Sequence, residues 1–290
     1  MTPDQYCQDK TLKSGSSFYY SFLFLPEQQR RAMHALYAFC REVDDVVDEC
    51  SDPTLARIKL QWWRDEVERS YAQQAQHPVG QALQALLSQF DLAREYFLEV
   101  IDGMEMDLER NRYADFSELG LYCYRVAGVV GLLSTEIFGY EDRKTPRYAT
   151  DLGLAFQLTN ILRDIPEDAR RDRIYLPQDE LLRFGVTEHD ILTGQENDNM
   201  RILFAFQAQR ALAYYDSALD KLPALERNRQ KAALIMARIY RETLQCIIDE
   251  AYPVMRKRVT LSPWKKLWLA WRTARQETHR HQELLIGRHG

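Results

Sequence analysis

The chain has 290 residues, of which 46% are hydrophobic and 28% charged, and its formal net charge is −5 at pH 7. This composition is typical of a soluble globular protein and excludes a chain dominated by disorder. With only 12 glycines and 10 prolines, the sequence lacks the dense turns of an all-β protein. Its apolar residues recur at helical spacing, so we predict an all-α fold.

The first chemically unusual element is a helix predicted at residues 30–49, RRAMHALYAFCREVDDVVDE, which follows the aromatic stretch SGSSFYYSFLFLP. On a helix Asp44 and Asp48 project from one face, where like charges cost about 0.2–0.5 kcal/mol per pair. Asp45 adds a third carboxylate. A bound cation would offset this repulsion. For the aromatic stretch we favour core packing for most residues, with a substrate tunnel as the alternative.

Further helices are predicted at about 54–73, 80–110, 117–138, 147–165, 200–220 and 227–250, with breaks near HPVG, FGYEDRKTP and KLP. The sequence has no internal repeat of fixed period, no low-complexity tract and no linker rich in Pro, Gly or Ser. We therefore predict a single domain over residues 1–290.

A second acidic cluster lies in QLTNILRDIPEDARRDRIYLP, residues 157–177. Asn160, Asp164 and Asp168 repeat every four residues, which stacks three oxygen-bearing side chains along one edge of a helix. Such oxygens suit Mg²⁺, which is usually completed by water and substrate phosphates, and the nearby arginines suit the phosphates themselves. Pro166 predicts a kink or a helix end before Asp168.

The two acidic clusters together predict a diphosphate site with Mg²⁺ between carboxylates and a leaving group. The alternative for each cluster alone is a solvated helix face. Two clusters at the same spacing, both in otherwise apolar helices, favour the metal site.

The C-terminal stretch is basic: residues 256–280 hold eight Lys or Arg against the single acid Glu277. Within it, Trp264, Trp268 and Trp271 recur at helical spacing. We favour a terminal helix whose Trp face packs on the protein body, with docking in a membrane interface as the alternative. Nucleic-acid binding is disfavoured by the acidic remainder of the chain.

Five scattered cysteines, none in a C-x-x-C pair, indicate neither a disulfide framework nor a zinc site and fit a reducing cytoplasm. No segment reads as a signal peptide or as an uncharged run long enough to span a bilayer. We therefore expect a cytoplasmic protein whose membrane contact would be peripheral, at the inner face. The histidines form no zinc-hydrolase pattern, and there is no G-x-G-x-x-G turn or P-loop.

The stretches YAFCREVDDVVDE, LYCYRVAGVVG and FQLTNILRDIPEDARRDRIYLP resemble the hallmark motifs of the squalene and phytoene synthase family, in matching order. SGSSFYYSFLFLP and IDGMEMDL extend the resemblance. Within the family, the chain most resembles the bacterial presqualene diphosphate synthases of hopanoid biosynthesis. It departs from the pattern at Pro166 and Asp172, where glycine is common.

The resemblance implies an all-α isoprenoid synthase fold with a deep cavity, and a site carried over by matching motif. Two or three Mg²⁺ ions would be held by Asp44, Asp45, Asp48, Asn160, Asp164 and Asp168. Substrate would contact Ser17, Phe18, Tyr37, Arg41, Gln157, Arg163 and Arg173, with Tyr240 and Arg258 matched on less distinctive stretches. Tyr122 resembles the family tyrosine linked to the later rearrangement, and Tyr124 competes for that role.

The implied activity is head-to-head condensation of two farnesyl diphosphates to presqualene diphosphate, on the way to squalene and hopanoids, with downstream isoprenoid enzymes as partners. The alternatives are a phytoene synthase using geranylgeranyl diphosphate, or a squalene synthase that completes an NADPH-dependent reduction, which we do not favour. A chain-elongating enzyme would carry a second D-D-x-x-D, and a class I cyclase an Asn–Ser–Glu set. Outside the enzymes, the chain could be a catalytically silent helical membrane adaptor.

Overall fold

The computed structural model describes residues 1–286, and within them every regular element is helical, apart from one isolated bridge between Arg112 and Ile174. In chain order the elements are α1 (Pro3–Lys13), α2 (Phe18–Phe22), α3 (Glu27–Glu49), α4 (Pro53–Tyr71), α5 (Pro78–Leu86), α6 (Arg94–Glu109), α7 (Phe116–Cys123), the π-helix η1 (Tyr124–Gly128), α8 (Val129–Phe138), α9 (Thr145–Arg170), α10 (Gln178–Arg183), α11 (Glu188–Thr193), α12 (Asp198–Lys221), α13 (Lys231–Asp249), the 3₁₀-helix η2 (Pro253–Met255) and α14 (Pro263–Ile286). The predicted all-α class and single domain are confirmed.

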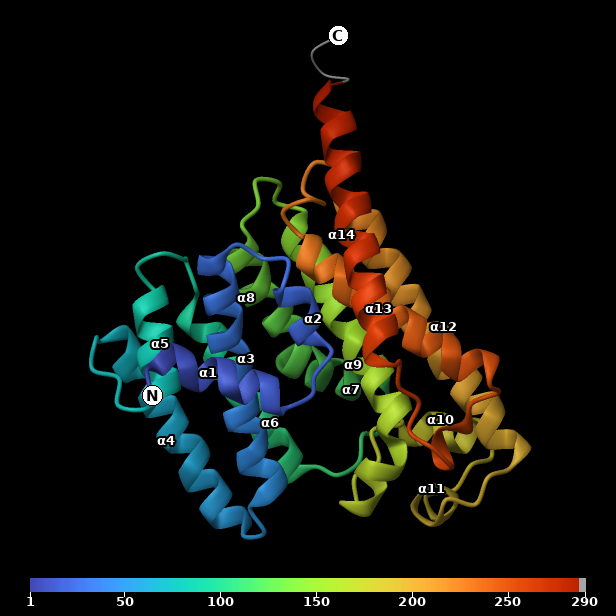
Figure 1. Cartoon of the computed structure of the whole chain (residues 1–290). Helices are drawn as coiled ribbons and strands as arrows, with labels where there is room; N and C mark the ends of the chain where they lie inside the picture. Colours follow the sequence, from blue (N-terminus) through green and yellow to red (C-terminus); the bar gives the residue numbers. More distant parts are fainter. Residues whose placement is uncertain (287–290) are drawn as a thin grey trace.

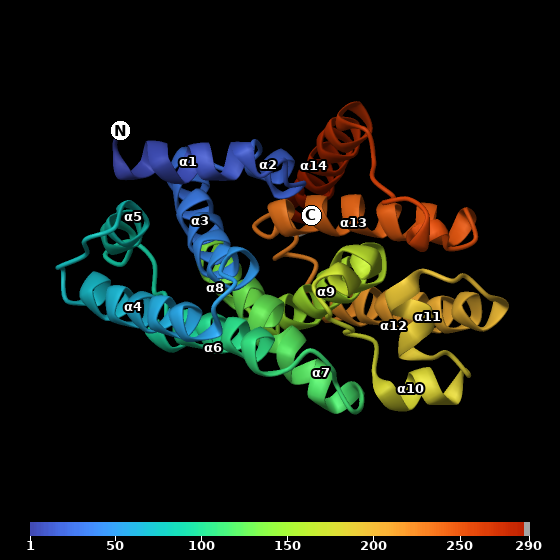
Figure 2. The ribbon, with the colours of Figure 1, turned by 90° about the horizontal axis from the view of Figure 1, so that it is seen from below.

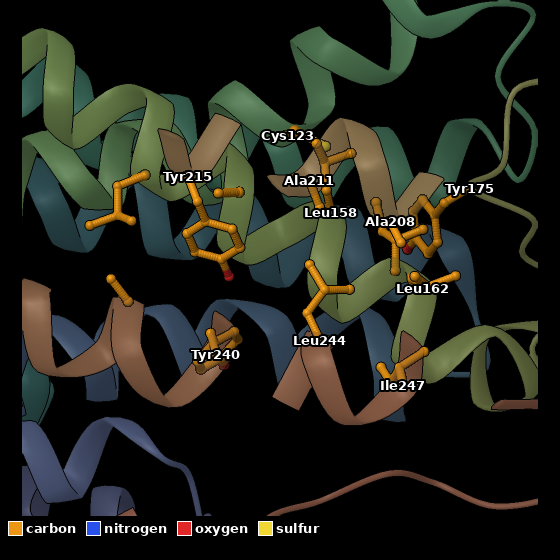
Figure 3. Close-up of a cluster of buried hydrophobic side chains, with 14 of the residues drawn as sticks. Cys123, Leu158, Leu162, Tyr175, Ala208, Ala211, Tyr215, Tyr240, Leu244 and Ile247 are labelled. Atoms are coloured by element: carbon orange, nitrogen blue, oxygen red, sulfur yellow. The ribbon is translucent and has the colours of Figure 1, made fainter. Parts of the chain in front are cut away.

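The core has two parts that meet along the middle of the molecule (Figures 1 and 2). Helix α9 runs between α3 and α8 on one side and α12 and α13 on the other. One cluster of buried side chains belongs mainly to α3–α6 and α8, and the other to α9, α12 and α13. Figure 3 shows part of the second cluster, in which Leu158 and Leu162 of α9 meet Ala211 of α12 and Leu244 of α13. Phe18, Val126 and Ala233 pack against both clusters.

Helix α3 forms as its sequence predicts. It begins directly after Pro26, and its apolar residues form one buried stripe, with Phe39 and Val43 fully buried. The chain leaves the helix at Cys50, and Asp52 then caps α4 by accepting from the Thr54 backbone N–H at 2.8 Å. The acids of α3 therefore sit on a rigid, fully packed helix.

The helix predicted at 80–110 is wrong, because the chain forms α5 and α6 with a turn between them. No Gly or Pro marks this break in the sequence. The Tyr71 hydroxyl of α4 donates to the backbone carbonyl of Leu92 and fixes the turn. The turn lets both helices pack against α4, so tertiary packing overrides the local helical pattern.

Of the kink or helix end expected at Pro166, the helix end is wrong, because α9 continues through Pro166 to Arg170. A proline costs the helix one backbone hydrogen bond and a steric clash with the preceding turn. Here it lies in the last turns of a helix whose earlier residues pack tightly against α12. Asp168 consequently stays on the same helix as Asn160 and Asp164.

The stretch Phe116–Phe138 is long and apolar enough by composition to cross a membrane. In this structure α7, η1 and α8 form one continuous run that packs against α6 and α9 and lines the central cavity. We interpret it as a core helix. Its π-helical turns at Tyr124–Gly128 lie where this run crosses α9.

The favoured interpretation of the C-terminal Trp face is wrong. Helix α14 packs on α13 through other residues, and Trp264 is 80% exposed. The basic residues 256–258 precede the helix, which begins at Pro263.

Candidate active site

A cavity of about 640 Å³ lies where the two parts of the core meet. Its walls come from α2, α3, α6, α7 to α9 and α13, with the segment after η2 and the start of α14 at its rim. Of the residues predicted for the site, the following line it: Ser17, Phe18, Tyr37, Arg41, Asp44, Asp48, Tyr122, Gln157, Asn160, Arg163, Asp164, Asp168, Arg173, Tyr240 and Arg258. Asp45 and Tyr124 do not.

Helix α3 directs its neighbouring acids to different partners. Arg41 donates to Asp44 at 2.9 Å and also contacts Asp45. Asp45 turns away from the cavity, because Lys10 of α1 approaches it and Glu42 at 2.9 Å each. Asp44 and Asp48, one turn apart, are the carboxylates that α3 presents to the cavity. Asp45 instead ties Arg41 to the α1 side of the helix.

Helix α9 presents the second cluster from the opposite wall. Asp164 accepts from Arg163 Nε at 2.8 Å and from Arg258 Nε at 2.9 Å. Asn160 contacts Gln157 through its amide nitrogen at 3.5 Å, and its Oδ1 atom is buried without a hydrogen-bond partner. A buried acceptor without a partner is costly and points to a group that the polypeptide alone does not supply.

One arginine binds the first cluster and lies close enough to Asp168 of the second cluster to lower its pKa. Arg173, which follows α9 in the chain, donates from Nη1 to Asp48 Oδ1 on α3 at 2.8 Å. Arg171 Nη2 approaches the other Asp48 oxygen at 3.4 Å. The acids of α3 and α9 therefore face each other across the cavity mouth with arginines between them.

Burial at the cavity mouth disfavours the charged form of two of these carboxylates. Loss of hydration, together with a smaller contribution from the nearby Asp48 carboxylate, raises the pKa of Asp44 to about 7. Loss of hydration likewise raises the pKa of Asp168 to about 8, with a contribution from Asp164. Both shifts come first from burial and then from neighbouring carboxylates, and the arginines oppose them only in part.

These residues fit Mg²⁺. The donors are carboxylate and amide oxygens, and one of them, Asn160 Oδ1, is buried without a hydrogen-bond partner. No cluster of three or more His, Cys, Asp or Glu within residues 1–286 is arranged to hold a metal unaided. Mg²⁺ typically uses only one or two carboxylates and completes its shell with water and phosphate oxygens.

A buried acid that sequence reasoning missed lies deeper in the cavity. Asp107 of α6 accepts from the hydroxyls of Tyr122 and Tyr175, at 2.9 Å each. The two hydroxyls are 3.3 Å apart, and the rings stack with centroids 5.0 Å apart. Loss of hydration raises the pKa of Asp107 to about 6, although Arg173 opposes the shift. Asp107 lies in the stretch IDGMEMDL. Its place in that stretch, which extends the resemblance to the family, was the one signal in the sequence that could have identified it as a site residue.

Lys266 in the first turns of α14 is a second residue that the sequence did not single out. It lines the cavity rim and lies 5.8 Å from the ring centroid of Tyr20. Burial lowers its pKa, and the nearby Arg163 and Arg258 lower it further. It forms no ion pair with any carboxylate in the described part of the chain. A half-buried ammonium among arginines favours an anionic ligand.

Below this charged mouth the cavity is apolar. Phe18, Phe156 and Tyr240 pack together, with the Phe156 and Tyr240 ring centroids 4.9 Å apart. Farther in, Gly131 lets the backbone of α8 approach that of α9, and Gly153 lets α9 approach η1. The site thus combines an anion- and cation-binding mouth with a water-excluding apolar interior.

The chain is similar to known proteins over most of its length. The family model described as squalene/phytoene synthase matches residues 11–265. A 15-cis-phytoene synthase of Synechococcus elongatus is 38% identical over 90% of this chain and 89% of its own. A phytoene synthase of Arthrospira platensis is 38% identical with the same coverage.

Among solved structures, a dehydrosqualene synthase in complex with a ligand superposes with a TM-score of 0.85 at 28% identity, covering 96% of this chain and 97% of that one. A squalene synthase from Alicyclobacillus acidocaldarius gives a TM-score of 0.77 at 29% identity, covering 86% and 94%.

Proposed function

The chain belongs to the squalene/phytoene synthase family, and we propose that it joins two molecules of one allylic prenyl diphosphate head to head. The observation that carries this proposal is the facing of two acid-bearing helices, α3 and α9, across the mouth of one apolar cavity. The charged groups of the mouth suit diphosphate, and the apolar interior suits prenyl chains.

For the metal we propose Mg²⁺, held by Asp44 and Asp48 on one wall and Asn160, Asp164 and Asp168 on the other. When bound, it would stabilise the charge that develops on the departing diphosphate. In this proposal Asp45 positions Arg41 through the contacts described above and does not bind metal. Arg41, Arg163, Arg173 and Arg258 would bind phosphate oxygens once the acids are occupied.

The proposed reaction breaks the C1–O bond of one substrate and releases diphosphate. C1 of that chain then bonds to both carbons of the 2,3 double bond of the second chain as a proton leaves, which closes a cyclopropane. The products are a cyclopropylcarbinyl diphosphate, diphosphate and one proton, and no reductant is consumed. The aromatic interior keeps water from the allylic cation.

We propose the departing diphosphate as the base that takes this proton. The Tyr122 hydroxyl already donates to Asp107. Burial raises the pKa of Tyr122 far above its ordinary value, so its phenolate is not accessible near neutral pH. Tyr122 and Tyr175 would instead orient the chains and face the cation with their rings.

For the prenyl chain we favour geranylgeranyl diphosphate, because the two curated relatives described above are phytoene synthases. Farnesyl diphosphate, and with it presqualene diphosphate formation, is the second candidate. It is supported by the likeness to a dehydrosqualene synthase and a squalene synthase structure. The relation to hopanoid synthesis stays a prediction.

The metal assignment can be tested with two adjacent residues of α3. Asp44→Asn should lower the rate of Mg²⁺-dependent diphosphate release by at least about a hundredfold, the order of loss when an electrostatic contact to the transition state is removed. Asp45→Asn is the matched control and should lose far less of the rate, because the Asp45 carboxylate faces Lys10 and acts only by positioning Arg41, which the amide oxygen of asparagine can still contact. Equal losses in both variants would refute the division of roles between Asp44 and Asp45.

A further inference from the structure

An apolar stripe on the outer face of α14 is uncovered in this structure. The stripe consists of Trp264, Leu267, Trp268 and Trp271, which are 80%, 38%, 49% and 50% exposed. They lie three or four residues apart and so share one side of the helix. Three exposed tryptophans on one short stripe are more than scattered apolar surface residues, and such a patch marks an interaction site.

The stripe is held on a firmly packed helix. The opposite face of α14 is buried, including Leu269, Ala270 and Ala274, and packs against α13. Arg227 donates from Nε and Nη2 to the two carboxylate oxygens of Glu277 at 2.8 and 2.6 Å, which clamps the helix to the segment before α13. In Figure 1 the last turns of α14 extend beyond the other helices.

Cationic side chains border the stripe. The guanidinium of Arg272 lies 5.1 Å from the Trp268 ring centroid, and that of Arg275 lies 5.6 Å from the Trp271 ring centroid. Both arginines are exposed and neither forms an ion pair with a carboxylate of residues 1–286. The face therefore offers indole rings together with unneutralised positive charge.

We propose that this face of α14 docks the protein on the surface of an anionic lipid bilayer. Tryptophan is enriched where apolar and aqueous phases meet, since its ring is apolar and its N–H needs a polar partner. Arginines beside such rings match the charge of anionic headgroups. A second copy of the same face would instead bring like charges together.

The location of the stripe suits a lipid substrate. Lys266, on the side of α14 opposite the stripe, lines the rim of the cavity. A bilayer under the stripe would therefore lie about one helix diameter, about 10 Å, from the cavity mouth. Prenyl chains could pass between bilayer and cavity with little exposure to water. The docking surface does not depend on which prenyl chain the enzyme uses.

The test is co-sedimentation of the full chain with vesicles of phosphatidylcholine containing about one third phosphatidylglycerol. We expect binding that falls with added salt and is weak on pure phosphatidylcholine. The triple variant Trp264→Ser, Trp268→Ser, Trp271→Ser and, separately, the double variant Arg272→Gln, Arg275→Gln should each bind at least about tenfold more weakly.

Matched controls change the same residue types elsewhere. Trp62→Ser removes an exposed tryptophan of α4, and Arg143→Gln with Lys144→Gln removes two exposed cations before α9. Neither control should alter binding. Diphosphate release from detergent-dispersed substrate should be unchanged in the stripe variants, which also reports that they fold.

Two results would overturn the proposal. One is wild-type protein that stays in the supernatant with anionic vesicles, or binds as well after the triple substitution. The other is a dimer in solution that the triple substitution dissociates, since a second copy would then be the occupant of the stripe.

Discussion

Replacement of Gly153 by alanine tests how closely the helices around the cavity are packed. A Cβ on Gly153 would lie 2.4 Å from the backbone oxygen of Ala127 and 2.9 Å from the Cα of Gly128. Both atoms belong to the backbone of η1, so no side-chain rotation can relieve the contact. Ordinary van der Waals contact begins near 3.4 Å, so α9 and η1 would have to separate by about 1 Å.

Overpacking of this kind costs about 1–3 kcal/mol, and a backbone partner puts Gly153→Ala at the upper end. For a chain of this size, about 3 kcal/mol corresponds to a fall in Tm of about 6 °C. Because Ala127 and Gly153 also line the cavity, the separation should lower kcat as well.

The matched control is Gly120→Ala on α7. A Cβ there meets nothing within 4 Å, so the same chemical change should raise stability by about 0.5–1 kcal/mol through helix propensity. Thermal unfolding followed by circular dichroism measures both variants. If Gly153→Ala were as stable as the wild type, or if both variants lost stability equally, the reasoning about backbone contact at this crossing would be refuted.

Three further changes have distinct expected outcomes. Lys266→Met should raise KM for the prenyl diphosphate about tenfold without lowering Tm, because it removes a half-buried cation that has no carboxylate partner; steady-state kinetics would contradict this if KM were unchanged. Burial lowers the pKa of His34 to about 4 in the folded protein, so the unfolded chain binds the proton more readily than the folded one. The free energy of unfolding therefore falls by about 3 kcal/mol in total as the pH is lowered from about 6.5 to about 4. Urea unfolding at pH 7 and pH 5 should show that His34→Leu flattens this dependence, and an unchanged slope would count against it. Asp172 has φ 55° and pairs with Arg112 at 2.9 Å. Asp172→Val should lower the free energy of unfolding by about 1–2 kcal/mol and Asp172→Gly by less, because valine is disfavoured at positive φ. Equal losses in the two variants would show that the ion pair dominates.

The two acidic clusters could be predicted from the sequence because four-residue spacing maps directly onto one helix face. Asp44, Asp48, Asn160, Asp164 and Asp168 all line the cavity. The helical period alone does not say where a side chain between two stripes will turn. Asp45 turns away because Lys10 of α1 approaches it, and the local sequence around either residue does not predict that contact.

Residues that depend on distant partners could not be found in this way. Asp107 acquires its role only when Tyr122 and Tyr175 meet it, and Tyr175 is 68 positions away in the chain. Lys266 reaches the cavity rim because α14 returns to pack beside α2 and α13. Neither the contact of Asp107 with the two tyrosines nor the position of Lys266 at the rim is marked by a periodicity or a motif in the sequence.

Helix boundaries failed where tertiary contacts decide them. The break between α5 and α6 carries no Gly or Pro and is fixed by Tyr71 from α4. The opposite error arose at Pro166, where a strong local breaker lies inside α9. The exposure of the Trp stripe is a third case, since the same periodicity describes a buried face and a docking face equally well.

The central claim is tested most directly by identifying the product. Purified protein is incubated with Mg²⁺ and either geranylgeranyl or farnesyl diphosphate, without reductant, and the extract is analysed by mass spectrometry. We expect a product that contains two prenyl chains, with turnover abolished by a chelator: prephytoene diphosphate or phytoene from the first substrate, or presqualene diphosphate if farnesyl diphosphate is used. Diphosphate release that yields only a prenyl alcohol or a cyclised single chain, or no Mg²⁺-dependent turnover of either substrate, would contradict head-to-head condensation.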